Sequence, residues 1–229
     1  MAVKLFQSDA DFAQAFDALL HAKREMDVDV DNVVSDIIMD VRRRGDEAVL
    51  DYTAKFDRLE LTAESMRISA EELASAAAKC KPETVEALKL AAKRIEAYHS
   101  KTLPEGLDYV DEAGVRLGAR WRPVQAAGLY VPGGTAAYPS SVLMNALPAK
   151  VAGVERLVMV VPTPDGVTNP LVLAAAHLAG VTEVYRVGGA QAVAALAYGT
   201  DTIAPVDKIV GPGNAYVAAA KRRVFGQVG

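Results

Sequence analysis

Short apolar segments that end in glycine loops recur in the second half of the chain, and this pattern constrains the fold more than any other feature. The first segment, 128–131, is too brief for a helix and is followed by a glycine loop at 132–134. Similar loops follow at 188–191 and 211–214, and each leads into an alanine-rich helical run. Parallel strands would bring all these loops to one edge of a sheet, which is the edge at which open α/β sheets bind ligands.

The alternation of strands with helices of about 10 to 15 residues is typical of βαβ units and predicts a parallel sheet. The predicted strands are 128–131, 156–161, 183–187 and 208–210. The predicted helices are 140–152, 170–179, 191–197 and 215–224. Right-handed crossovers place such helices on the faces of the sheet. We therefore expect an α/β fold with an incomplete Rossmann-like parallel sheet flanked by helices.

The first hundred residues have the spacing of helices rather than strands. Ser8 and Asp11 resemble a capping box at the start of one helix, and a second helix is expected to begin near Asp31. Gly45 should end that second helix, and Asp46 is placed to cap a third. The sequence therefore predicts a mostly helical region before the sheet.

Further along, the chain changes from helical to extended patterning. A short β-like passage is predicted at 65–68, a capping box of Ser69 and Glu72 follows it, and Pro82 opens a long helix. Residues 107–124 alternate like a β-hairpin. We place a boundary after the hairpin. It separates a helical region with hairpin (1–125), completed by sequence absent from this chain, from a Rossmann-like domain (126–229).

Charge and cysteine content exclude several classes of protein. The net charge of the 229 residues is -4, and the only arginine- and lysine-rich triplets, 42–44 and 221–223, lie near predicted helix ends, where cations complement the dipole. Nucleic acid is therefore not an expected partner. No apolar run is long enough to span a membrane, so we expect no membrane partner and a cytoplasmic location. The single cysteine, Cys80, excludes an internal disulfide.

Glycine loops that lead into helices suit a phosphate group, because backbone N–H groups and the positive end of a helix dipole meet there. None of the loops has the spacing G-x-G-x-x-G, and no acidic residue lies about 20 residues later in the context that this motif requires. Beside the loops, Tyr130 could stack on a nucleotide, and Gln191 and Asn214 could bond ribose hydroxyls or an amide. The alternative interpretation makes Tyr130 a core aromatic residue and Asn214 an ordinary helix cap.

Several segments taken together resemble the histidinol dehydrogenase family. They are GLYVPGG (128–134), PSSVLMNALPA (139–149), VGGAQAVAALA (187–197), VGPGNAYV (210–217), RRGD (43–46) and YTAKFD (52–57). The resemblance implies an NAD-dependent, zinc-containing homodimer that oxidises L-histidinol to L-histidine with two NAD. It also implies NAD contacts at Tyr130, Gln191 and Asn214. Adding the loop residues, the cofactor site expected in 126–229 comprises Tyr130, Pro132, Gly133, Gly189, Gln191, Gly213 and Asn214.

The chain is shorter than the members of that family. The zinc ligands, the glutamate and histidine acid–base residues and the substrate contacts implied by the resemblance belong to sequence absent here. His21, His99 and His177 lack metal-ligand spacing. We therefore expect no catalytic residue and no metal ligand in this chain, which would supply the NAD-binding half and be inactive alone. We also expect the helices before Pro104 to expose apolar faces and to favour self-association.

Two other hypotheses stay open at this point. The chain could be a stand-alone nucleotide-binding or scaffold module without catalysis. It could also be a different dehydrogenase that uses Cys80 as an aldehyde nucleophile, although its helical run shows no electropositive pocket for a thiolate.

Overall fold

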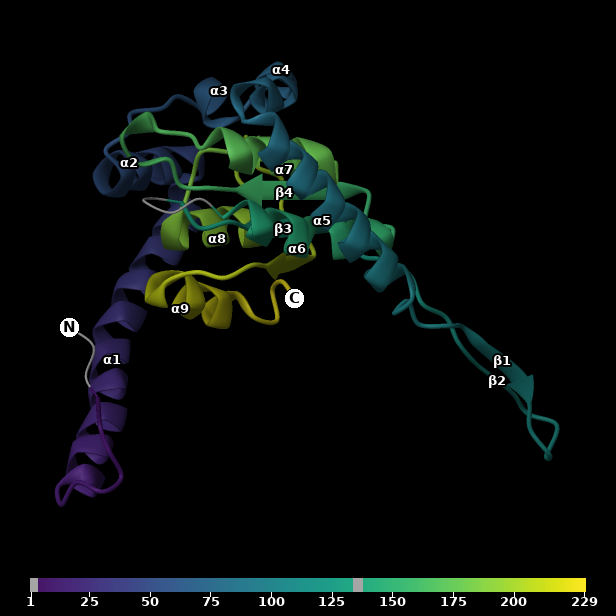
Figure 1. Ribbon diagram of the computed structural model, residues 1–229, viewed down its shortest axis with the longest axis horizontal. Helices are drawn as coiled ribbons and strands as arrows, with labels where there is room; N and C mark the ends of the chain where they lie inside the picture. Colours follow the sequence, from purple (N-terminus) through teal and green to yellow (C-terminus); the bar gives the residue numbers. More distant parts are fainter. Residues whose placement is uncertain (1–3, 134–137) are drawn as a thin grey trace.

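A central sheet with helices on both faces forms the body of the molecule, and two extensions project from it (Figure 1). The computed structural model describes residues 4–133 and 138–229, and of residues 21–28 the backbone alone. One extension is the first part of helix α1 (Phe12–Arg44), and the other is the hairpin of β1 (Leu107–Val110) and β2 (Arg116–Ala119). No helix among the described residues is long and apolar enough to cross a membrane.

Four parallel strands form the central sheet, as the sequence predicts. They are β3 (Ala126–Tyr130), β4 (Arg156–Val160), β5 (Glu183–Tyr185) and β6 (Lys208–Val210), in the order β5-β4-β3-β6. Every residue of β3 is buried, as expected of a parallel strand covered on both faces. From β3 the chain moves outward to β4 and β5, then returns to the other side of β3 for β6. The direction of strand order therefore reverses between β3 and β6.

Alternating side chains of the strands face two separate hydrophobic clusters. Leu129 and Met159 belong to the cluster that contains α6 (Pro139–Val151) and α7 (Pro170–Ala179). Val158 and Val160 belong to the cluster that contains α8 (Gly189–Tyr198) and α9 (Ala215–Val224). Because successive strand residues point to opposite faces, α6 and α7 cover one face and α8 and α9 the other. The predicted α/β fold is confirmed.

Helices of the N-terminal region add a further layer to each face. α1 and α2 (Asp46–Asp57) pack on the α8 side, and the clusters put α4 (Ala70–Ser75) and α5 (Pro82–Ser100) on the α6 side. A four-residue helix, α3 (Ala63–Met66), and 3-10 turns at Ala76–Lys79 and Pro164–Gly166 complete the helical elements of the described chain. Both hydrophobic clusters therefore contain residues from either side of position 125, and the domain boundary there stays a prediction.

The prediction of two helices before Gly45 is wrong. A single helix, α1, runs from Phe12 to Arg44 because no glycine or proline interrupts that stretch. The capping box at Ser8 is also wrong, since α1 has Asp11 as its N-cap and no side-chain cap bond forms there. Gly45 ends α1 as expected, with a positive φ of 58°.

Other predicted helix signals are only partly right. Ser69 caps α4, but the Glu72 carboxylate bonds Arg186 of the β5–α8 loop instead of closing a capping box. Asp46 opens α2 without capping it, and its Oδ2 accepts a hydrogen bond from Thr202. Of the passage 65–68, the first residues lie in α3, and only Arg67 forms an antiparallel bridge, to Tyr185 on β5. Long-range partners therefore replace the local ones expected.

The apolar face of α1 is covered along its second half. Val34, Ile37 and Val41 are buried in the cluster that contains α8 and α9. The expectation that the N-terminal helices expose their apolar faces is wrong for the second half of α1. Toward the start of α1, Phe16 and Leu19 are exposed, so self-association through that end stays a prediction.

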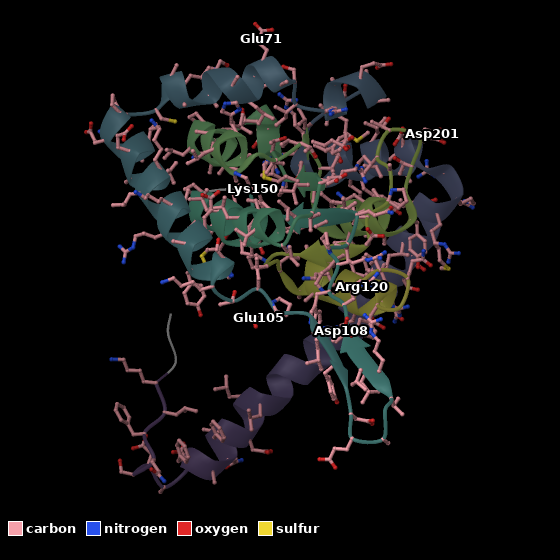
Figure 2. The ribbon with its side chains drawn as sticks, turned by 90° about the vertical axis from the view of Figure 1, so that its right-hand side faces the viewer. Glu71, Glu105, Asp108, Arg120, Lys150 and Asp201 are labelled. Atoms are coloured by element: carbon pink, nitrogen blue, oxygen red, sulfur yellow. The ribbon has the colours of Figure 1, made fainter. Side chains whose placement is uncertain are left out.

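The predicted hairpin is present and lies away from the packed layers. β1 pairs with β2 in antiparallel register, from Leu107 opposite Ala119 to Val110 opposite Arg116, and every residue of both strands is exposed. Figure 2 shows the hairpin beyond the body of the molecule, with Asp108 and Arg120 labelled at its base.

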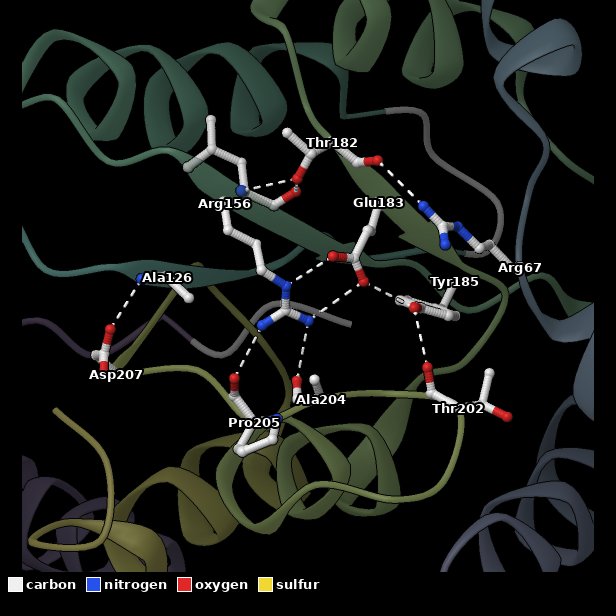
Figure 3. Close-up of polar contacts among 11 residues, drawn as sticks. Arg67, Ala126, Arg156, Thr182, Glu183, Tyr185, Thr202, Ala204, Pro205 and Asp207 are labelled. Atoms are coloured by element: carbon white, nitrogen blue, oxygen red, sulfur yellow. Dashed lines mark hydrogen bonds and ion pairs between the residues drawn. The ribbon is translucent and has the colours of Figure 1, made fainter.

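A partly buried polar network joins the amino ends of β4 and β5 (Figure 3). Arg156 donates to both carboxylate oxygens of Glu183, at 2.6 and 3.2 Å, and to the carbonyl oxygens of Ala204 and Pro205. The Tyr185 hydroxyl donates to Glu183 Oε2 at 2.8 Å. This network lies at the sheet edge opposite the glycine loops, so we assign it to stability.

Tyr185 gives the network a pH dependence. Burial, with the Glu183 carboxylate, raises the pKa of Tyr185 to about 12 from the ordinary 10.0. The stabilisation is therefore fully present below pH 10 and is lost as the pH rises to about 12, because only the unfolded state loses the proton in that window. Between pH 9 and 11.5 the unfolding free energy of the wild type should therefore fall. In Tyr185→Phe we expect this fall to be smaller by about 2 kcal/mol, as measured by urea unfolding at the two pH values.

Tyr98→Phe is the control for this change, because Tyr98 is 65% exposed on α5. It should keep the full pH dependence of the wild type. The same fall in Tyr185→Phe as in wild type would contradict the assignment.

Candidate functional site

The glycine loops meet at two adjoining cavities at the carboxyl edge of the sheet. The first, which we call the loop-edge cavity, has a volume of about 450 Å³, and a second of about 360 Å³ adjoins it. Both are lined by Tyr130, Gly133 and Asn214. Gly189 and Gln191 line the first, and Pro132 and Gly213 line the second. All seven residues predicted for the cofactor site thus lie together. Gly134 lies outside the described residues.

The position of these cavities follows from the topology. The loops after β3 and β6 diverge where the strand order reverses, so they leave an opening between them. α8 and α9 begin at this opening, with Gly188 and Asn214 as their N-caps. Two helix N-termini therefore lie at one opening, and their positive ends favour an anionic ligand there.

Tyr130 ends β3 and is a core residue as well as a lining residue. It is 4% exposed, and its hydroxyl accepts a hydrogen bond from the Gly189 N–H at 3.0 Å. Burial raises the pKa of Tyr130, the Gly189 N–H opposes the rise, and Asp57 adds to it. Because so little of the residue is exposed, we assign Tyr130 to holding the Gly189 loop rather than to stacking on a base.

Gln191 lies in the first turn of α8 and is almost fully buried. It is 1% exposed, and its Oε1 has no hydrogen-bond partner among the described residues. A buried acceptor without a donor costs about 1–3 kcal/mol. A Cβ at Gly189 would lie 2.5 Å from this Oε1, so glycine at 189, with its φ of 63°, leaves room for the oxygen. Such an oxygen is suited to a ligand that brings an N–H or O–H.

Asn214 caps α9, so the alternative interpretation of this residue holds. Its Oδ1 accepts a hydrogen bond from the Val217 N–H at 3.1 Å. The residue is nevertheless exposed and lines both cavities, so the cap and a ligand contact are compatible. A Cβ at Gly213 would overlap the Val217 side chain, and this close approach explains the glycine before the cap.

The loop after β6 is held tightly against β3. Gly211 has a φ of 117°, and a Cβ there would overlap the carbonyl oxygen of Tyr130. Lys221 Nζ on α9 donates to the Gly211 carbonyl oxygen at 3.2 Å. Gly133 is equally close to its neighbour, since a Cβ there would overlap the Pro162 carbonyl oxygen. These contacts fix the loops that line the cavities.

Asp57 is the acidic residue of this site, and sequence reasoning gave it no role. It is the last residue of α2, it is 8% exposed, and it lines the loop-edge cavity. Its Oδ2 has no hydrogen-bond partner within the described parts of the chain. Burial raises the pKa of Asp57, and the charge of Arg58 opposes the rise. The only signal in the sequence was its place in the YTAKFD segment (52–57).

The apolar wall of the loop-edge cavity was missed as well. Val33 and Ile37 on α1, with Phe56 on α2, line it opposite the glycine loops. The N-terminal helices therefore complete a site that the sequence pattern placed wholly in residues 126–229.

Other chemically reactive residues lie elsewhere. The structure describes no group of three or more His, Cys, Asp and Glu that could hold a metal ion, and the side chain of His21 lies outside the described residues. Cys80 is half-buried against the α6 side, where its thiol donates to the Ala76 carbonyl oxygen. It does not line the loop-edge cavity, so the geometry does not support its use as a nucleophile there.

A wider hollow, of about 680 Å³, follows the hairpin and includes Trp121. Its lining residues are exposed, and none of them holds a buried polar atom that lacks a partner within the described chain. The loop-edge cavity, with two such atoms, is therefore the better candidate for a binding site.

Comparison with known proteins agrees with the fold. The family model described as histidinol dehydrogenase matches residues 20–229. The histidinol dehydrogenase of Rhodospirillum rubrum is 68% identical over 229 residues, which are 100% of this chain and 53% of the relative. That of Gluconobacter oxydans is 63% identical over 226 residues, or 99% of this chain and 53% of the relative.

A solved structure agrees with these relatives. The crystal structure of histidinol dehydrogenase from Elizabethkingia anophelis superposes with a TM-score of 0.81 at 36% identity, covering 86% of this chain and 45% of that one. The chain thus spans about half the length of the curated relatives it matches.

Proposed function

The chain belongs to the histidinol dehydrogenase family, an oxidoreductase family, and from this premise we propose that its loop-edge cavity and the adjoining cavity bind NAD. The reaction we propose for the whole enzyme is the oxidation of L-histidinol to L-histidine, a step of histidine biosynthesis. The 229 residues would supply the cofactor side of that reaction.

The residues at the loop edge fit a dinucleotide. Gln191 Oε1 and Asp57 Oδ2 are buried acceptors that have no donor among the described residues, and both lie in residues lining one cavity. The glycines at 133, 189 and 213 leave no room for a Cβ against Pro162, Gln191 and Val217, so these loops pack closely beside the cavities. The N-termini of α8 and α9 favour the negative charge of a pyrophosphate. One observation carries the proposal: the buried side-chain oxygen of Gln191, which has no hydrogen-bond donor in the described chain, lies in a residue lining the cavity where the strand order reverses.

Each residue has a distinct role in this proposal. Gln191 accepts a hydrogen bond from a ribose hydroxyl or from the carboxamide, and Asn214 contacts the ligand while it caps α9. The loops at Gly133, Gly189 and Gly213 bring backbone close to the pyrophosphate. Tyr130 acts as a positioning residue, because its hydroxyl holds the Gly189 N–H. NAD, when bound, supplies the hydride acceptor for alcohol oxidation.

Zinc does not fit the described residues, because no suitable cluster of His, Cys, Asp or Glu is found in them. We derive no step through zinc for this chain. We propose instead that the metal ligands and the acid–base residues of the enzyme come from outside these 229 residues, since the relatives are about twice as long. On this proposal, the chain with NAD, histidinol and zinc forms no NADH above background, and rates near those of an intact relative would contradict it.

Calorimetric titration with NAD tests the site directly. Gln191→Leu keeps a buried side chain of similar size but removes the amide oxygen. We expect it to weaken NAD binding at least tenfold, because about 1.4 kcal/mol of hydrogen bonding is lost. The melting temperature should not fall, since the variant also removes the buried oxygen that lacks a donor in the described chain.

Gln227→Leu is the matched control for this titration. Gln227 is exposed and does not line the loop-edge cavity, so NAD affinity should match wild type. Equal NAD affinity in Gln191→Leu and wild type would overturn the role of Gln191. A wild-type chain that binds no NAD would overturn the proposed site, and a scaffold role would then be the better explanation.

A further inference from the structure

The position of Asp57 is unfavourable for the stability of the fold. It is the last residue of α2, and a carboxylate at a helix C-terminus meets the negative end of the dipole. The residue is 8% exposed, and its Oδ2 has no hydrogen-bond partner anywhere in the described chain. Local structure therefore gives no reason for an acid at this position.

The neighbouring cation does not neutralise Asp57 by direct contact. The Arg58 guanidinium instead makes two hydrogen bonds to Asp165, at 2.7 and 2.5 Å, across the surface. Both partners of that pair are largely exposed. Asp57 is therefore left as a lining residue of the loop-edge cavity, and its Oδ2 has no partner in the described chain.

The charge in the lining of the loop-edge cavity is negative. Among its described lining residues, Asp57 is the only charged one, and the others are apolar or uncharged polar groups. Gln191 adds a second buried acceptor oxygen to the same cavity. The Tyr130 hydroxyl already accepts the Gly189 N–H. Two acceptors and no cation suit a ligand group that donates hydrogen bonds and carries no negative charge.

We propose that Asp57 is a specificity-determining residue that accepts a hydrogen bond from the adenosine ribose of NAD and rejects the 2′-phosphate of NADP. This inference rests on the proposed NAD site. In open α/β sheets an acid bonded to the ribose 2′-hydroxyl selects NAD, because a phosphate at that position would meet a negative charge. The acids about 20 residues after the glycine loops, Glu155 and Asp207, directly precede β4 and β6, so they lie at the opposite edge of the sheet. Here α2, which precedes the sheet in sequence, brings the acid to the site.

Affinities for NAD and NADP, measured by calorimetry on the whole chain, test this role. The wild type should bind NAD at least tenfold more tightly than NADP. Asp57→Asn keeps the shape of the side chain and removes its charge, so we expect the preference to shrink at least tenfold. Without ligand, the variant should melt no lower than wild type, since a buried charge is gone. Asp57→Ser serves the same purpose if the asparagine variant does not fold.

Asp51→Asn is the control, because Asp51 lies on the same helix and its side chain is 62% exposed and paired with Arg44. It should keep the wild-type preference for NAD. If the wild type prefers NAD and Asp57→Asn keeps that preference as fully as Asp51→Asn does, the role of Asp57 is overturned while the NAD site stands. If the wild type binds NAD and NADP equally, the inference also fails. If neither nucleotide binds, the proposed function fails and the inference with it.

Discussion

Gly211→Ala is expected to lower the unfolding free energy of the chain by about 2–5 kcal/mol, which combines the strain of a positive φ with overpacking. Gly211 has a φ of 117°, and a Cβ there would overlap the carbonyl oxygen of Tyr130. That oxygen belongs to the end of the buried strand β3, so it cannot move aside without disturbing the sheet. Urea unfolding measures the change, and calorimetry should show NAD binding lost as the loop is displaced.

Gly226→Ala separates the two causes of this effect. Gly226 also has a positive φ, of 93°, but a Cβ there would meet nothing within 4 Å. The control should therefore show the strain alone, about 1–2 kcal/mol, and keep NAD affinity. An equal loss of stability in the two variants would mean that Gly211 is not pressed against β3.

Leu129→Ala is expected to cost about 2–5 kcal/mol of unfolding free energy, since removing a buried leucine side chain leaves a cavity. Leu129 is the fourth of the five residues of β3, is 0% exposed and belongs to the cluster that contains α6 and α7. The strand is paired on both sides, so the backbone cannot collapse into the space. Urea unfolding of Leu90→Ala provides the control, because Leu90 on α5 is 59% exposed and should change stability by less than about 0.5 kcal/mol. Similar losses for both leucines would contradict this description of the core.

The sheet half of the fold could be predicted from sequence because its signals are local. Short apolar runs bounded by glycine gave strands whose bounds differ from the observed ones by at most two residues. Helix α7 was predicted with its observed bounds, because the Asn169 cap bond and the left-handed Gly180 that bracket it depend only on neighbouring residues. The meeting of the glycine loops followed from topology alone, since the carboxyl ends of parallel strands share an edge.

The N-terminal region was harder because distant residues decide it. Glu72 had the spacing of a capping box, yet Arg186 offers it two charge-assisted bonds, which are stronger than the local one. Asp57 entered the site because α2 packs beside α8, a contact between residues about 130 positions apart. No spacing in a single sequence reveals such a contact, and the dinucleotide pattern places its acid only after a glycine loop.

A crystal structure of the chain grown or soaked with NAD would test the central claim most directly. The claim is that loops from three parts of the sheet edge form one dinucleotide site. We predict NAD across the two adjoining cavities, with hydrogen bonds to Gln191 and Asn214 and its pyrophosphate beside the glycine loops. NAD bound only elsewhere, such as in the hollow beside Trp121 on the hairpin, would contradict it.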